Sequence, residues 1–487
     1  MGHRVHAFGD DALGRLDAVG VAAAIAAGDV SRTEVLEAAL ARIDAVEPEL
    51  HAVAVDDRSA ARHRDRGTHT AAGCFAGVPS VIKNNTAVAG IPTLHGSRAV
   101  PATPATHDEP FTTQFRATGA TIVAASTLPA FGLTASTEFV DREPTRNPWD
   151  TDRSAGASSG GSAALVAAGA VPLAQGNDGG GSIRIPAAAC GLVGLKPTRG
   201  RLAAAPQSRS MPIDLVCEGV LTRTVRDTAR FLAEVERFAP ARSLPRIGRV
   251  EAPSSRRLRI AVFTDPITGP LDADTRLGLS QTVSVLESLG HRLDPVDVPV
   301  GTEFVDQFTL YWGLMGFGID HLGARLFGAG FDRTRLDPFT RELSRLFARN
   351  FYRLPTALRG LRRANARFLG LFADHDVILS PTLAHTPPPL GHLSPAGDFD
   401  TVFERLVRFL AFTPINNTSG APGISLPLAW SATGVPIGMH FSARPGDERT
   451  LLEVAYELEE AVGVTLVCDA RCTDTKGPVR DESHTGP

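Results

Sequence analysis

GNDGGGSIRIPAAACGLVGLKP, residues Gly176–Pro197, places three consecutive glycines, Gly179–Gly181, directly before Ser182. Three glycines cost backbone entropy and add no side chain to the packing, so the run indicates a specific structural need. A plain tight turn is one explanation. A backbone whose N–H groups converge on a reactive oxygen, as an oxyanion hole requires, is another. The flanking residues predict a strand that runs into the loop and a helix that begins near Pro186.

A glycine loop can also bind phosphate groups through its backbone N–H groups. The chain contains neither G-x-x-x-x-G-K-[ST] nor G-x-G-x-x-G, however. Nucleotide binding is therefore not favoured.

Lysine is rare in this chain: only Lys83, Lys196 and Lys476 are lysines among the 49 basic Lys and Arg residues. Arginine supplies surface charge equally well but does not readily lose its proton. Lys83 lies in GVPSVIKNN, an apolar strand-like run that predicts its burial, and burial favours the neutral amine that can act as a base. A lysine that extends from a strand end into solvent is the alternative.

A second serine motif, AGASSGGSAALV, contains a G-x-S-x-G pattern around Ser158. In an α/β-hydrolase this serine would be the nucleophile, and its base would be a downstream histidine. The candidates are His375, His385 and His392. No histidine lies within either serine motif, so Lys83 is the better candidate for the base that a serine nucleophile needs.

These motifs resemble those of the amidase signature enzymes, which are serine hydrolases with a Ser–Ser–Lys triad. Lys83 is similar to the lysine of that family, Ser158 to its bridging serine, which follows a cis peptide bond, and Ser182 to its nucleophile. The two serines are 24 positions apart, as in the family. The resemblance covers roughly residues 17–465 and is weakest at about 237–370.

Two positions depart from the family pattern. Asn84 follows the lysine where the family often has aspartate, and Ala155-Gly156-Ala157 precedes Ser158 where Pro-Gly-Gly is common. Loss of a carboxylate beside the lysine should favour its neutral form.

The alternation of predicted helices and strands indicates an α/β protein. The resemblance implies the amidase signature fold, with a mixed twisted sheet covered by helices on both faces. It also implies one domain over residues 1–470, which includes a variable, mostly helical excursion at about 237–373. A polar, disordered tail is expected at 471–487.

The resemblance further implies amide hydrolysis through an acyl-enzyme on Ser182, with Lys83 as base, Ser158 as proton relay, and no metal or cofactor. Asp178 and Arg184 are expected to form a charge pair that holds the glycine loop. The oxyanion would be bound by the backbone N–H groups of Gly179, Gly180, Gly181 and Ser182. The motifs are closest in style to bacterial amidases of the cyclic amide, nylon-oligomer hydrolase type.

The sequence motifs are compatible with other functions. The same triad could hydrolyse esters, ureas or carbamates, or transfer an acyl group to an amine. The chain could also be the glutamine-hydrolysing subunit of a tRNA amidotransferase, or a catalytically silent binding protein on the same scaffold.

The composition is that of an ordinary globular protein, with 43% hydrophobic and 21% charged residues and a net charge of −4 over 487 residues. Nothing in it indicates a nucleic acid or membrane partner. The N-terminus has no apolar signal region, and five scattered cysteines fit reduced thiols, so a cytoplasmic protein is expected. Cys468 and Cys472 lack a nearby histidine and predict no metal site. The expected partner is a small-molecule amide, and a homodimer is an option that the sequence leaves open.

Overall fold

The computed structural model describes residues 2–67, 72–205 and 211–469. The expected tail at 471–487, with Cys472 and Lys476, lies outside the described residues. Within the described ranges, no helix combines the length and the apolar character that a membrane span requires.

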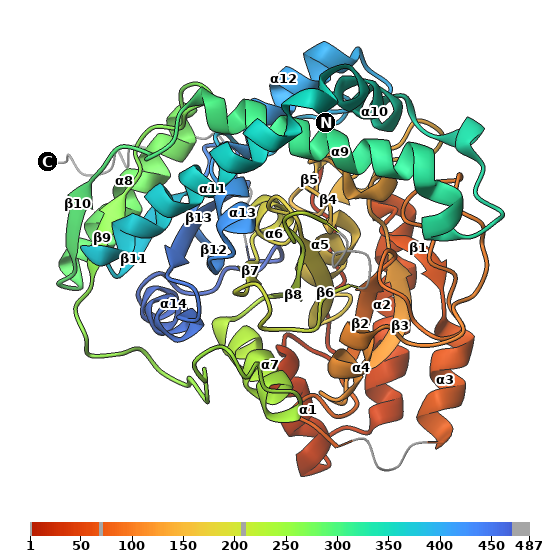
Figure 1. Cartoon of the computed structure of the whole chain (residues 1–487). Helices are drawn as coiled ribbons and strands as arrows, with labels where there is room; N and C mark the ends of the chain where they lie inside the picture. The colour runs from red at the N-terminus through yellow and green to blue at the C-terminus, as the bar shows by residue number, and fades with distance from the viewer. Residues whose placement is uncertain (1, 68–71, 206–210, 470–487) are drawn as a thin grey trace, which may run out of the picture.

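A mixed sheet forms the centre of the molecule (Figure 1), and 11 strands of the described chain contribute to it. Its strand order is β1-β3-β2-β6-β8-β7-β12-β13-β11-β9-β10. In chain order the bounds are β1 (Val53–Asp56), β2 (Pro79–Lys83), β3 (Thr121–Ser126), β6 (Leu173–Asp178), β7 (Val193–Lys196), β8 (Cys217–Thr222), β9 (Arg259–Val262), β10 (Arg292–Pro295), β11 (Val377–Pro381), β12 (Gly423–Trp430) and β13 (Pro436–Ala443). A separate antiparallel pair consists of β4 (Arg146–Asn147) and β5 (Asp150–Ser154).

Two parallel parts of the sheet flank an antiparallel centre. Strand β2 is parallel to both β3 and β6, and β9 is parallel to both β10 and β11. From β6 through β8, β7, β12 and β13 to β11, each neighbouring pair is antiparallel. The mixed sheet that the family resemblance implied is therefore confirmed.

The helices surround this sheet. Their bounds are α1 (Ala18–Ala27), α2 (Arg32–Leu50), α3 (Arg58–Gly67), α4 (Pro110–Arg116), α5 (Gly160–Ala167), α6 (Arg184–Cys190), α7 (Val225–Phe238), α8 (Ala273–Ser288), α9 (Thr302–Phe327), α10 (Pro338–Asn350), α11 (Leu354–Gly370), α12 (Phe399–Leu410), α13 (Pro414–Ser419) and α14 (Glu448–Val462).

Both faces of the sheet are buried under helices. Val81 and Ile82 are adjacent in β2 and therefore point to opposite faces, and they belong to two different apolar clusters. One cluster includes Leu40 of α2 and residues of α5, and the other includes Phe111 of α4 and Phe231 of α7. The α/β architecture with helices on both faces is thus confirmed.

Local sequence signals account for several of these elements. Helix α2 begins after Ser31, whose hydroxyl accepts the Glu34 N–H while the Glu34 carboxylate accepts the Ser31 N–H, as a capping box requires. The first half of the helical excursion expected at about 237–373 contains the strand–helix–strand unit β9–α8–β10, which adds two strands at one end of the sheet. The second half forms the helices α9, α10 and α11, and Figure 1 shows α9 crossing the upper part of the molecule.

Candidate active site

Lys83 is the last residue of β2, and its parallel neighbour β6 ends at Asp178. The carboxyl ends of parallel strands lie at the same edge of a sheet, so the lysine and the start of the glycine loop come together there. The Lys83 side chain is completely buried. Its backbone N–H donates to the side-chain carbonyl of Gln175 on β6, at 2.8 Å, which fixes the strand end.

The Lys83 amine faces two polar partners. Its Nζ lies 2.8 Å from Ser158 Oγ and donates to Asn177 Oδ1 at 2.7 Å. Burial lowers the pKa of Lys83 to about 7, although the charges of Glu218 and Asp178 act in the opposite direction. A neutral amine next to a serine hydroxyl is therefore accessible near neutral pH.

Ser158 is buried and lies in the turn before α5. The peptide bond between Ala157 and Ser158 is cis, as the family resemblance implied. Gly132 approaches the serine closely: it has φ +70°, and a Cβ at this position would lie 2.9 Å from Ser158 Oγ. A glycine at position 132 thus leaves room for the Ser158 hydroxyl.

Ser158 and Ser182 line the same cavity. The backbone carbonyl of Ser182 accepts the N–H of Ser159 at 3.2 Å, which ties the two serine segments together. In the described structure, no hydrogen bond joins the two serine hydroxyl groups. The hydrogen bond between Lys83 and Ser158 is present. The Ser182 hydroxyl lies in the same cavity but does not hydrogen-bond with the Ser158 hydroxyl.

The three glycines of the loop have different roles. Gly181 has φ +135°, and a Cβ there would lie 2.4 Å from Thr413 Oγ1, so only glycine fits. Its N–H donates to Asp178 Oδ1 at 2.7 Å. Gly179 and Gly180 line the cavity instead. Among the described residues, the N–H groups of Gly179, Gly180 and Ser182 have no hydrogen-bond acceptor.

A buried ion pair braces this loop. Asp178 and Arg184 are both fully buried, with 2.9 Å between Asp178 Oδ2 and Arg184 Nε. The carboxylate also accepts the N–H groups of Gly181 and Ile183, on either side of Ser182. Burial opposes ionisation, but the Arg184 charge and the hydrogen bonds lower the pKa of Asp178 far below its ordinary range. The two charges thus fix the backbone around Ser182.

Two asparagines belong to the site without having been predicted. Asn177 holds the Lys83 amine, and Asn417 donates to Asp178 Oδ1 at 2.8 Å while its Oδ1 accepts from Arg184 at 2.7 Å. Asn177 could have been found, because it is a polar residue at the end of a buried strand beside the glycine loop. Asn417 lies 239 positions after Asp178, and no local sequence signal connects the two.

The histidine alternative for the base finds no support. None of His375, His385 and His392 hydrogen-bonds with Ser158 in the part of the chain that the structure describes, where the neighbour of this serine is Lys83. The G-x-S-x-G pattern therefore does not form the nucleophile–histidine arrangement of an α/β-hydrolase.

The sequence model of the Amidase family matches residues 34–452 of this chain. The chain belongs to the amidase signature family. A protein named "Putative amidase AmiC" from Mycobacterium leprae is 50% identical over 459 residues, which cover 94% of this chain and 97% of that relative. The 6-aminohexanoate-cyclic-dimer hydrolase of Pseudomonas sp. (strain NK87) is 34% identical over 475 residues, covering 92% and 94% of the two chains.

A match with a solved structure supports the same family assignment. The structure of 6-aminohexanoate cyclic dimer hydrolase complexed with substrate matches with a TM-score of 0.82 and 30% identity, over 92% of this chain and 97% of that chain. The family and its named members show that this chain is a hydrolase acting on amides.

Proposed function

We propose that this enzyme cleaves amide C–N bonds through an acyl-enzyme on Ser182, with Lys83 as base and Ser158 as proton relay. The contact that carries the proposal is the 2.8 Å hydrogen bond between Lys83 Nζ and Ser158 Oγ, in a site where the lysine has no access to solvent. A serine hydroxyl becomes a strong nucleophile only when a base removes its proton. The neutral lysine, acting through Ser158, is that base.

The reaction would proceed as follows. Lys83 takes the proton of Ser158, and Ser158 takes the proton of Ser182, whose Oγ forms a bond to the amide carbonyl carbon. The proton then returns through Ser158 to the leaving nitrogen as the C–N bond breaks. Water, activated by the same relay, attacks the acyl-enzyme and releases the carboxylate.

The oxyanion that forms during attack needs hydrogen-bond donors. The N–H groups of Gly179, Gly180 and Ser182 are available, because no protein acceptor within the described ranges uses them. The N–H of Gly181 donates to Asp178 and so belongs to the brace of the loop. The Asp178–Arg184 pair acts by positioning these donors.

The substrate is an uncharged amide. No Asp, Glu, Lys or Arg is among the described residues that line the cavity around Ser182. A buried ammonium or carboxylate without a partner is costly, so this cavity does not suit glutamine with its two charges. The name of the relative from Pseudomonas gives 6-aminohexanoate cyclic dimer as its substrate. This cyclic amide should be among the first substrates tested.

The test is turnover of a panel of linear, aryl and cyclic amides by the wild type, Ser182→Ala and Lys83→Ala, with Ser288→Ala as a matched serine control on α8. We expect both site variants to lose at least about 10³-fold in kcat/KM. A fluorophosphonate should label Ser182, as identified by mass spectrometry. Full activity in Ser182→Ala, or labelling at another serine, would refute the proposal.

Product analysis with added hydroxylamine separates hydrolysis from acyl transfer. Free carboxylate as the main product supports hydrolysis. Hydroxamate as the main product at low hydroxylamine would assign the same acyl-enzyme to a transferase.

A further inference from the structure

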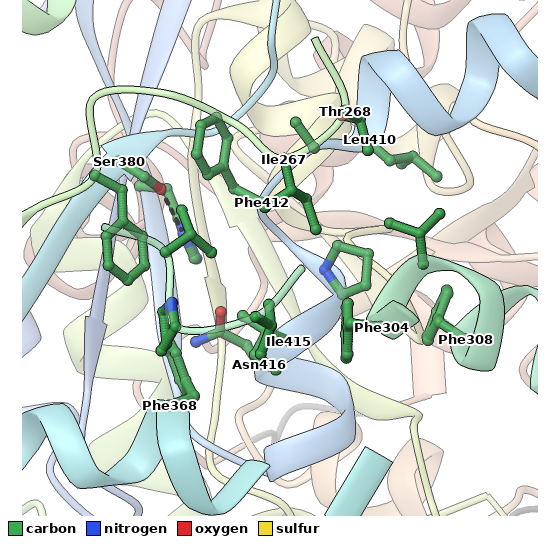
Figure 2. A pocket seen from close by; sticks show the side chains of 18 of the residues that line it. Ile267, Thr268, Phe304, Phe308, Phe368, Ser380, Leu410, Phe412, Ile415 and Asn416 are labelled. Carbon is green, nitrogen blue, oxygen red and sulfur yellow. Dashed lines mark hydrogen bonds between the residues drawn. The ribbon is translucent and has the colours of Figure 1, made fainter. Parts of the chain in front are cut away.

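Figure 2 shows a second cavity, which shares part of its lining with the catalytic one. The two cavities share three lining residues, Phe308 and Trp312 of α9 and Leu410 at the end of α12. These three side chains border both spaces. A molecule that reacts at Ser182 therefore lies next to a second, apolar space.

The second cavity carries no fixed charge. Its described lining includes no Asp, Glu, Lys or Arg and consists mainly of apolar side chains, among them Ile267, Phe304 and Ile415. His440 is the ionisable residue in this lining, and burial together with the charge of Arg184 holds the pKa of His440 well below its ordinary value. The histidine is neutral, so a charged group entering this space would find no partner.

Two polar atoms of the lining lack a partner in the described structure, Thr268 Oγ1 and Asn416 Oδ1. Asn416 Oδ1 is buried and accepts no hydrogen bond there. Its orientation is fixed, because Asn416 Nδ2 donates to the carbonyl of Pro422 at 3.1 Å and to Ser442 Oγ at 3.0 Å. Figure 2 shows the oxygen pointing toward the group of side chains around Ile415 and Phe412. A buried acceptor without a donor is unfavourable, and a bound molecule with an O–H or N–H group would satisfy it.

We propose that this cavity binds the remote part of the amide substrate, an uncharged apolar chain or ring that ends in a hydrogen-bond donor paired with Asn416 Oδ1. The substrate extends from Ser182 past Phe308, Trp312 and Leu410. The inference rests on the proposed function, because it takes the molecule in the second cavity to be the one that reacts in the first. It narrows the substrate class from uncharged amides to elongated apolar ones.

A series of linear amides tests the class of substrate. We expect kcat/KM to rise from butanamide to octanamide by up to about fourfold for each methylene group that enters the cavity. 8-Hydroxyoctanamide should exceed nonanamide, which has a methyl group in place of the hydroxyl. 8-Aminooctanamide and the monoamide of octanedioic acid, which carry a charge at the same end, should fall below octanamide by at least about tenfold.

A parallel series of N-alkylacetamides identifies which side of the scissile bond occupies the cavity. If chain length raises kcat/KM only in the primary amides, the acyl part lies there. If it does so only in the N-alkylacetamides, the amine part lies there. Equal rates for charged and uncharged ends, or no dependence on chain length in either series, would overturn the proposal.

A substitution that fills the second cavity should abolish the preference for long amides over short ones. Ile267→Trp adds a ring among the residues that line only the second cavity, and Leu277→Trp adds the same ring on the exposed side of α8 as a control. Ile267→Trp should bring the ratio of kcat/KM with octanamide to kcat/KM with butanamide close to one, whereas Leu277→Trp should keep the ratio of the wild type. Val305→Phe fills the same cavity from α9 and serves if Ile267→Trp does not fold.

Calorimetric measurement of octanamide binding to the Ser182→Ala variant separates this proposal from the catalytic one. If no amide is hydrolysed but Ser182→Ala binds octanamide, and Ile267→Trp in that background abolishes binding, the cavity assignment holds and the catalytic proposal fails. If short amides are hydrolysed while Ile267→Trp and Val305→Phe handle octanamide like the wild type, the catalytic proposal holds and the cavity assignment fails.

Discussion

The proposed mechanism makes activity depend on the protonation state of Lys83. Only the neutral amine can accept the Ser158 proton. Burial lowers the pKa of Lys83 from 10.5 to about 7, against the opposing charges of Glu218 and Asp178. Below this pH the amine holds its proton, so kcat/KM should fall by about tenfold for each pH unit. Well above it, kcat/KM should reach a plateau.

The lowered pKa of Lys83 determines how much of the lysine is neutral at pH 7. A lysine with a pKa of 10.5 is neutral in only about one molecule in 3,000 at pH 7, whereas a pKa of about 7 makes about half of the molecules neutral. Burial at the end of β2 therefore increases the reactive form roughly a thousandfold at this pH. A lysine exposed at a strand end would not supply a base in neutral solution.

The assay is kcat/KM between pH 5 and 10 with an uncharged amide, because such a substrate does not itself titrate. The rate of fluorophosphonate labelling of Ser182 should follow the same curve. Circular dichroism at each pH confirms that the fold persists. A profile that is flat from pH 5 to 9, or one with its midpoint near 10, would refute the reasoning.

A neighbouring acid gives an independent check. Glu218 is fully buried, and its charge raises the pKa of Lys83. Burial and the nearby Glu109 raise the pKa of Glu218 itself to about 8. Glu218 is therefore mostly protonated near pH 7, and Glu218→Gln removes only the remaining fraction of its negative charge, so the midpoint of the activity profile should move slightly to lower pH. A move to higher pH would contradict the electrostatic account.

Three substitutions test the rest of the site. Lys83→Arg should be as inactive as Lys83→Ala, because a guanidinium does not lose its proton, and equal steady-state rates of the two variants would confirm this. Gly181→Ala should lower the melting temperature, whereas Gly180→Ala should not. Of these two glycines, only Gly181 has a left-handed φ and a crowded Cβ position. Equal melting temperatures of the two variants would contradict this account of the loop. Asp178→Asn should reduce the free energy of unfolding by about 3–5 kcal/mol in urea titrations, because it leaves the Arg184 charge buried and unpaired; a loss below about 1 kcal/mol would show that the pair does not brace the fold.

Several elements could be predicted because their signals are local. The capping residues Ser31 and Glu34 mark the start of α2, and the apolar run before Lys83 indicates a buried strand. The glycine run before Ser182 indicates a special backbone. The rarity of lysine favours a chemical role for Lys83 as a base, and the burial of its side chain agrees with that role.

Other parts of the site could not be read from the chain. The contact of Asn417 with Asp178 joins segments separated by 239 positions, and the contact of Thr413 with Gly180 joins segments separated by 233. The glycine run by itself also predicts that the three glycines are equivalent oxyanion donors. The structure distinguishes them, because Asp178 takes the N–H of Gly181.

What the sequence determined by itself is the set of chemical groups: a rare lysine after a strand, two serine motifs at a set spacing, and a loop of glycines. What only the tertiary structure decided is their environment. The parallel pairing of β2 with β6 sets Lys83 beside the loop, and complete burial lowers the pKa of its amine. The uncharged second cavity similarly arises where α9 and α12 meet the sheet. Solvent exclusion and packing depend on residues brought together from distant parts of the chain, so no short stretch of sequence specifies them.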